Sequence, residues 1–333
     1  MPVVRSSFQP PFFLRNGHLQ TILPTLLRRR YLVSFLRERL ELADGDFVDL
    51  GWATSGADRL AIISHGLEGS SADDCVRGMA TRLLRKRWDI LAWNFRGCGL
   101  EPNRLVRSYH SGETGDLGAV IALAAERYSR IALIGFSLGG NVTLKYLGEG
   151  GCHPAVVAGI AISVPIDLAA SAYAIDHRWS NRIYLRRFLS RLLPKIRAKA
   201  LLFPDQLDIS RSHLVRTLRE FDNLYTAPIH GFRDAEEYWE RSSARRYLEG
   251  IRVPALLLNA QDDPFLTPES LPYAEAEKNP QLFFEAPRSG GHVGFIDMAS
   301  NFRRWHESRS LEFLEQAAGG VASVSCQLPG ASR

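Results

Sequence analysis

The amino-acid sequence contains few cysteines, and none of them stands in a pattern that predicts a metal site or a disulfide framework. The four cysteines are Cys75, Cys98, Cys152 and Cys326. They form no C-x-x-C pair and no Cys/His group with the spacing of a zinc site. The sequence therefore gives no reason to expect a metal ion, another cofactor or stabilising disulfides.

Long apolar runs are also missing. No stretch of about 18 consecutive apolar residues occurs, which argues against a membrane-spanning helix. The N-terminal residues lack a basic segment followed by an apolar segment and a small-residue cleavage site, and Pro10, Pro11 and Pro24 interrupt the early apolar residues. We therefore expect a soluble protein of the reducing cytoplasm.

The chain has no large excess of one sign of charge. Lysine and arginine number 41 against 36 aspartates and glutamates, a net charge of +5. The basic residues are scattered without a block of five or more, so no nucleic-acid partner is expected. The densest basic run, Arg28-Arg29-Arg30, follows the apolar residues 19–27. A solvated helix end explains this run best, and a weak contact with an anionic membrane surface is the alternative.

What the sequence does contain is the composition of an ordinary globular protein, with 45% hydrophobic and 23% charged residues in 333. That length allows one large α/β domain or two small ones. Apolar runs of strand length cover residues 47–53, 60–64, 90–94, 131–134, 156–164, 253–258 and 282–285. The central runs are nearly continuous, as in strands buried on both faces of a mostly parallel sheet.

Helical patterns lie between these runs, over residues 76–87, 113–128 and 138–147, and Asp73 or Asp74 can cap the first of them. This alternation of strands and helices predicts an α/β, doubly wound fold. It breaks over residues 165–249, which show helical periods but no convincing strand. Residues 184–193 are amphipathic. Such a segment, placed over the carboxyl ends of the strands, forms a lid in many enzymes, or else it only covers a face of the sheet.

Residues 135–139 read Gly-Phe-Ser-Leu-Gly, the G-x-S-x-G pattern, at the end of the apolar run 131–134 and directly before a predicted helix. A strand, a tight glycine-flanked turn and a helix make up the nucleophile elbow of a serine hydrolase. Gly135 and Gly139 let the strand and the helix pass closely without a Cβ clash. The pattern predicts that Ser137 is a nucleophile.

A serine nucleophile needs a base, and the base needs an orienting carboxylate. In enzymes with this elbow the acid and then the histidine follow the serine along the chain. The acid is expected in the loop after residues 255–258, where Asp262 and Asp263 are adjacent. His292 follows the next strand, among glycines that permit its loop to turn back over the serine. We expect Asp263 to be the triad acid and Asp262 to hydrogen-bond the loop backbone, with the reverse assignment as the alternative.

The remaining histidines lack this chain order and are expected to be structural. His110 is the best competitor, but it precedes Ser137. The oxyanion hole requires two backbone N–H groups. We expect one from Leu138, the residue after the nucleophile, and one from Leu67, which follows His65-Gly66 at the end of an early strand. His65 is more plausible as a brace for that loop than as a base.

With these residues in place, the chain resembles the α/β-hydrolase superfamily, and within it the YheT-like subfamily of bacterial hydrolases and their eukaryotic relatives. The resemblance covers nearly the whole chain and is carried by residues 16–21 (NGHLQT), 65–70 (HGLEGS), 94–99 (NFRGCG), 109–112 (YHSG) and 135–141 (GFSLGGN). A longer signature of the subfamily is matched by Asp222, Gly231, Phe232, Glu237, Tyr238, Ser243, Pro254, Asp262 and Asp263. Trp239 stands where that signature usually has tyrosine.

The resemblance implies a single α/β-hydrolase domain over residues 1–333, with a mostly parallel eight-stranded sheet, flanking helices and residues 165–249 as a helical lid. It also implies that Ser137, Asp263 and His292 are the charge-relay residues. We expect a small-molecule acyl or lipid-like ester as substrate. Two alternatives share the scaffold: an enzyme of other chemistry, such as a hydrolase-fold haloperoxidase, and a non-catalytic binding protein.

Overall fold

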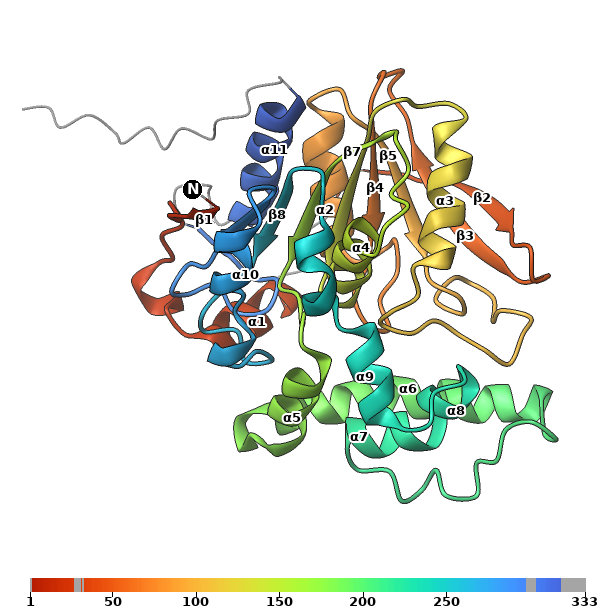
Figure 1. The fold of residues 1–333 in the computed structure, drawn as a ribbon. Coiled ribbons are helices and arrows are strands. Elements are labelled where there is room, and N and C mark those ends of the chain that lie inside the picture. The colour runs from red at the N-terminus through yellow and green to blue at the C-terminus, as the bar shows by residue number, and fades with distance from the viewer. Residues whose placement is uncertain (1, 27–30, 32, 298–303, 319–333) are drawn as a thin grey trace, which may run out of the picture.

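The computed structural model describes residues 2–26, 31, 33–297 and 304–318. Within these residues one sheet of nine strands has the order β1-β9-β8-β7-β6-β4-β5-β3-β2 (Figure 1). The strands are β1 Val3–Val4, β2 Leu36–Glu41, β3 Phe47–Ala53, β4 Leu60–Ser64, β5 Asp89–Asn94, β6 Ile131–Phe136, β7 Val156–Ile162, β8 Ala255–Leu258 and β9 Leu282–Glu285. Only the β2–β3 and β3–β5 pairs are antiparallel. The predicted α/β fold with a mostly parallel sheet is confirmed.

The sheet has one strand more than the eight that were expected, and two of its strands escape the apolar pattern. Strand β1 is only two residues long and pairs with β9 through Val3 and Val4. Strand β2 reads Leu-Arg-Glu-Arg-Leu-Glu and lies at the opposite edge of the sheet. Its charged residues suit an edge strand, because they discourage pairing with other chains. Both strands lie at an edge of the sheet, and neither sequence has the nearly continuous apolar run that marks the central strands.

Helices cover both faces of the sheet (Figure 1). α2 (Asp74–Leu84) and α11 (Trp305–Ala318) pack on one face, and α3 (Gly115–Ala125), α4 (Leu138–Gly148) and α10 (Tyr273–Lys278) pack on the other. Along β4, Leu60 and Ile62 point into one of these two cores while Ala61 and Ile63 point into the other. This alternation is the reason that central strands are apolar on both sides.

The helices follow the predicted pattern with differences of a few residues at their ends. Asp73 occupies the N-cap position of α2, but its side chain makes no capping hydrogen bond. No bounds were predicted for α1 (Gly17–Leu26), α10 or α11, and Pro24 lies inside α1.

Most of residues 165–249, between β7 and β8, is helical. They contain α5 (Leu168–His177), α6 (Arg182–Leu202), α7 (Leu218–Phe221), α8 (Ala227–Ile229) and α9 (Ala235–Ser242), with shorter turns over Trp179–Asn181, Asp222–Thr226 and Ala244–Gly250. We call this segment the helical insertion. It has apolar clusters of its own and lies beyond the carboxyl ends of the parallel strands (Figure 1).

No helix in the described part of the chain combines the length and the apolarity needed to cross a lipid bilayer. The basic run Arg28-Arg29-Arg30 lies outside the described residues, and so does Cys326.

Candidate active site

Ser137 occupies the sharp turn between β6 and α4. Its backbone has φ 52° and ψ −118°, a strained conformation for a residue with a side chain. The turn is held because the Ser137 N–H donates to the carbonyl of Ile162 at 2.9 Å. A Cβ atom on Gly135 would lie 2.2 Å from the carbonyl oxygen of Gly139, and one on Gly139 would lie 2.4 Å from that of His65. Only glycine fits at these two positions, as the G-x-S-x-G pattern predicted.

The side chains of Ser137, His292 and Asp263 form one hydrogen-bonded chain. His292 Nε2 lies 2.9 Å from Ser137 Oγ, and His292 Nδ1 lies 2.9 Å from Asp263 Oδ2. A carboxylate only accepts hydrogen bonds, so it favours the imidazole tautomer with the proton on Nδ1. The lone pair of Nε2 is then directed at the Ser137 hydroxyl, which is the arrangement that a general base requires.

Asp263 is held in place on its second oxygen. The carboxylate is 3% exposed, and its Oδ1 accepts the N–H of Phe265 at 2.9 Å. Asp262 is directed elsewhere: its Oδ1 accepts the N–H of Gly291 at 2.9 Å, and burial raises the pKa of its carboxyl group. The structure therefore places Asp263 against the imidazole and Asp262 against the backbone of the histidine loop.

The loop that carries His292 is fixed by the N-terminal helix α1. The N–H of His292 donates to Thr21 Oγ1 at 2.8 Å, and Gln20 Oε1 accepts the N–H of Ile296 at 2.8 Å. Gly291 adopts φ 57°, and a Cβ atom there would lie 2.4 Å from the carbonyl oxygen of Gly17. The segment 16–21 was singled out in the sequence without a role. In the structure this segment holds the histidine loop. The sequence could not predict that role, because the contacting residues Thr21 and His292 are 271 positions apart.

The two residues expected to form the oxyanion hole, Leu67 and Leu138, both line the cavity beside Ser137. A Cβ atom on Gly66 would come within 3.3 Å of Ser137 Cβ, so this glycine lets the Leu67 loop lie against the nucleophile. The next residue, Glu68, has φ 54°. Its N–H donates to Tyr109 Oη at 2.8 Å, and Tyr109 Oη donates back to Glu68 Oε1 at 2.8 Å.

The insertion also contacts this loop. Lys195 Nζ of α6 donates to Glu68 Oε1 at 2.8 Å, and Arg191 donates to the Glu68 carbonyl oxygen at 3.1 Å. Sequence reasoning missed Glu68, Tyr109 and Lys195 as supports of this loop. Tyr109 lay within a noticed motif, but nothing in the sequence placed Lys195 near it.

His65 and His110 make backbone contacts instead of contacting Ser137. His65 is fully buried; its ring lies 2.7 Å from the Gly66 carbonyl oxygen and accepts the N–H of Phe95 at 3.2 Å. Burial lowers the pKa of His65 to about 4, so its ring is neutral at pH 7. His110 lines the cavity but accepts the N–H of Gly112 at 3.1 Å. His65 therefore acts as a loop brace, as predicted.

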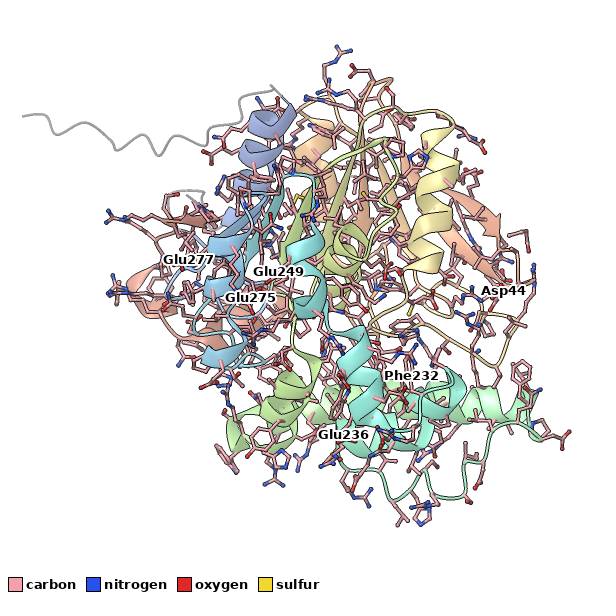
Figure 2. The ribbon with its side chains drawn as sticks, viewed as in Figure 1. Asp44, Phe232, Glu236, Glu249, Glu275 and Glu277 are labelled. Atoms are coloured by element: carbon pink, nitrogen blue, oxygen red, sulfur yellow. The ribbon has the colours of Figure 1, made fainter. Side chains whose placement is uncertain are left out.

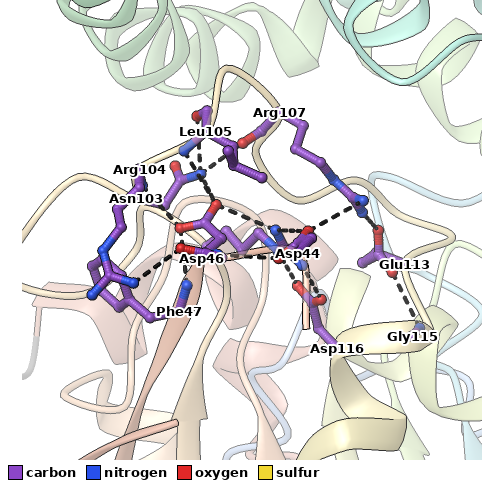
Figure 3. Close-up of polar contacts among 12 residues, drawn as sticks. Asp44, Asp46, Phe47, Asn103, Arg104, Leu105, Arg107, Glu113, Gly115 and Asp116 are labelled. Atoms are coloured by element: carbon purple, nitrogen blue, oxygen red, sulfur yellow. Dashed lines mark hydrogen bonds and ion pairs between the residues drawn. The ribbon is translucent and has the colours of Figure 1, made fainter. Parts of the chain in front are cut away.

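A buried ion-pair network supports the loops on this side of the sheet (Figure 3). Arg96, which is 3% exposed, forms two hydrogen bonds of 2.7 Å with Asp116 and further ones with Asp44 and Asp46. Asn103 donates to Asp46 Oδ2 at 2.6 Å. The network joins the loop after β5 to α3 and to the β2–β3 turn, which fixes the path of the chain toward Tyr109 and His110.

The described cysteines are free thiols, and all three are partly buried. Burial raises the pKa of Cys75 to about 12 and that of Cys98 to about 11. Protonated thiols are poor nucleophiles and poor metal ligands. Over the residues that the structure describes, no group of three or more His, Cys, Asp or Glu side chains could hold a metal ion.

A cavity lies between Ser137 and the helical insertion. It encloses about 1110 Å³, counting the solvent at its open mouth. Its lining is mainly apolar and includes Leu168 and Ile175 of α5, Phe188 and Leu192 of α6, and Phe265. A concave, mostly apolar site of this kind suits a small ligand with a hydrocarbon part.

The cavity also has polar groups under the insertion. Asp222 Oδ2 accepts the indole N–H of Trp239 at 2.8 Å, and Asp222 Oδ1 accepts the hydroxyl of Thr226 at 2.6 Å. Burial raises the pKa of Asp222 to about 6. Trp239, which stands where tyrosine was expected, thus supplies a hydrogen-bond donor through its ring nitrogen. The Ser171 hydroxyl, on α5, lines the same cavity and has no partner in the described structure.

Comparison with known proteins gives the class of the molecule. Residues 62–299 match the family described as "alpha/beta hydrolase fold". An esterase of Pyrococcus furiosus has the same fold, with a TM-score of 0.59 and 22% identity over 86% of this chain and 92% of the esterase. The chain belongs to the α/β-hydrolase family.

Two curated relatives lie closer in sequence. The Escherichia coli (strain K12) protein named "Putative esterase YheT" is 38% identical over 319 residues, which cover 93% of each chain. A monoacylglycerol lipase of Saccharomyces cerevisiae is 33% identical over 265 residues, 77% of this chain and 59% of the lipase. The YheT-like resemblance read from the sequence motifs is confirmed, and this protein is an esterase- or lipase-like α/β hydrolase.

Proposed function

We propose that this protein hydrolyses carboxylic esters of acyl or lipid-like substrates through an acyl-enzyme intermediate. The observation that carries the proposal is the hydrogen-bonded chain from Ser137 through His292 to Asp263, at the floor of a mainly apolar cavity. The esterase and lipase names of the relatives support the same activity.

In the first half-reaction Ser137 Oγ attacks the ester carbonyl while His292 Nε2 takes the hydroxyl proton. The carbonyl oxygen becomes an oxyanion, for which we propose the N–H groups of Leu67 and Leu138 as donors. When the tetrahedral intermediate collapses, the bond to the alcohol oxygen breaks and His292 returns the proton to the leaving alcohol. Asp263 stays ionised and stabilises the imidazolium.

In the second half-reaction a water molecule replaces the alcohol. His292 takes one of its protons, and the resulting hydroxide attacks the acyl carbon of the Ser137 ester. The acid leaves and Ser137 Oγ recovers its proton from His292. Both half-reactions need only the residues already assembled, and no step calls for a cofactor.

We further propose that residues 1–333 form one hydrolase domain with the helical insertion as its lid. The acyl group would lie beneath the insertion, against apolar side chains such as Leu168, Phe188 and Phe265. Each buried methylene is worth about 0.8 kcal/mol, or close to fourfold in specificity.

The experiment is hydrolysis of p-nitrophenyl esters from acetyl to decanoyl. We expect kcat/KM to rise with chain length and then to fall once the cavity is full. Leu168→Phe, which fills part of the cavity, should move the optimum to a shorter chain, while the exposed Leu214→Ala serves as control. A flat profile would show that the acyl group lies in solvent, and no turnover of any ester would contradict the proposed function itself.

A further inference from the structure

The outer face of helix α6 is basic and apolar at the same time. The helix, Arg182–Leu202, carries seven lysines and arginines and no acidic residue. Arg182, Arg186 and Arg197 are exposed on one side of it. On the same side Ile183 is 61% exposed and Leu201 is 81% exposed. Successive residues of a helix turn by about 100°, so these five side chains form one stripe along α6.

The arginines of this stripe have no acidic partners. In the part of the chain that the structure describes, Arg182 and Arg186 form no ion pair, and Arg197 donates only to the hydroxyl of Ser212, at 3.3 Å. Exposed arginines elsewhere do have acidic partners. Arg241 of α9 pairs with Glu237 at 3.2 Å, and Arg246, which follows α9, pairs with Glu240 at 2.8 Å. The positive charge of this stripe is therefore not compensated by acidic side chains in the described part of the chain, whereas Lys195 of the same helix is paired with Glu68.

A groove beside the stripe combines both characters. Its apolar wall is made by Leu185, Leu189 and Leu193 of α6 with Val215, and the side chains of Arg182, Arg186, Arg197 and Arg216 surround it. Trp179, 80% exposed, and Leu202, 59% exposed, add apolar surface at the two ends of the helix. Guanidinium groups beside exposed aliphatic and indole side chains match a surface of phosphate headgroups and hydrocarbon.

Other partners fit this face less well. Nucleic acid would engage the arginines but would leave the exposed leucines and isoleucine in water. A second copy placed face to face would bring the uncompensated arginines of both chains together. Of the acidic side chains labelled in Figure 2, Glu249, Glu275 and Glu277 lie around α10 and away from α6. Glu236 lies in the insertion, but it is already paired with Arg219 at 2.7 Å.

We propose that the outer face of α6 docks on the anionic surface of a lipid bilayer. Another face of the same helix presents Phe188, Leu192 and Ile196 to the cavity above Ser137. A single helix thus separates the lipid surface from the active-site cavity, which places the cavity next to a supply of lipid-like substrate. Docking itself does not require turnover, so it stands or fails independently of ester hydrolysis.

The test is flotation of the full chain with phosphatidylcholine vesicles, with and without roughly one-third phosphatidylglycerol. We expect binding only to the anionic vesicles, and loss of that binding at about 0.5 M salt. Each basic residue near such a surface is worth about fivefold in binding, so R182Q/R186Q/R197Q should bind roughly 100-fold more weakly. Ile183→Ser with Leu201→Ser should also weaken binding, by about tenfold.

The matched control is R241Q/R246Q/R252Q, which changes the net charge equally on another surface. It should bind as the unchanged chain does, and every variant should keep its melting temperature. Three results would overturn the proposal: no preference of the unchanged chain for anionic vesicles, equal binding by the α6 triple variant, or an equal loss in the control. Ser137→Ala is assayed alongside and should bind normally, because docking is separate from turnover.

Discussion

The imidazole of His292 lies 2.9 Å from the hydroxyl of Ser137, although 155 residues separate the two along the chain. Two different parts of the fold bring them together. Ser137 is set by the strained turn after the central strand β6, while His292 is set by a loop that hydrogen-bonds to α1 at the beginning of the chain. The geometry of the proposed reaction therefore depends on contacts that span nearly the whole protein.

Asp263→Asn should reduce ester turnover far more than Asp262→Asn. An amide facing the imidazole selects the wrong tautomer, which costs about 10⁴-fold in a well-studied serine protease. Asp262 accepts hydrogen bonds from the backbone of the histidine loop, such as the N–H of Gly291, and the oxygen of asparagine can still accept them. The measurement is the steady-state kcat of each variant. A lower kcat for Asp262→Asn than for Asp263→Asn would make Asp262 the triad acid.

Thr21→Val should lower kcat with little change in KM. The substitution removes the hydroxyl that accepts the N–H of His292, so a partly buried donor loses its partner at a cost of up to about 1–3 kcal/mol. Displacement of the base then slows the chemical step by roughly tenfold to a hundredfold. Thr21→Ser, which keeps the hydroxyl, should restore kcat. Thr21 would have no positioning role if both variants behaved alike.

Asp222→Asn should change how stability depends on pH. Burial raises the pKa of Asp222 from 3.8 to about 6, so folding favours the protonated carboxyl group. Its contribution to stability is present in full below about pH 4 and is lost as the pH rises through 6. The free energy of unfolding of the unchanged chain, relative to the variant, should fall on the order of 2 to 3 kcal/mol across that range.

Denaturant unfolding at pH 4 and pH 7 measures this difference. The exposed Asp205→Asn removes the same charge outside the cavity and is the control. A difference between the unchanged chain and Asp222→Asn that stays constant with pH would show that the carboxyl group of Asp222 is not perturbed in the folded protein.

The central part of this architecture could be predicted from the sequence because its signals are local. Buried parallel strands such as β4 and β6 are continuous apolar runs, and the turn at Ser137 needs glycine on either side. The order of serine, acid and histidine then follows from the succession of strands. Even the choice between Asp262 and Asp263 could be argued from their distance to the end of β8.

The features that could not be predicted depend on long-range contacts or on weak edge signals. The charged strand β2 is stabilised by pairing with β3, and its sequence alone resembles a solvated loop. The support of the Leu67 loop by Lys195 joins residues 127 positions apart through Glu68. Neither contact has a local pattern, because each arises only when the insertion and the sheet are assembled.

The most direct test of the account is covalent labelling by a fluorophosphonate, a probe that reacts only with an activated serine. We expect the unchanged chain to be labelled once, at Ser137, as located by mass spectrometry of its peptides. Ser137→Ala should not be labelled, and His292→Ala should be labelled far more slowly. No labelling of the folded, unchanged chain, or equal labelling of Ser137→Ala, would contradict the claim that Ser137 is the nucleophile.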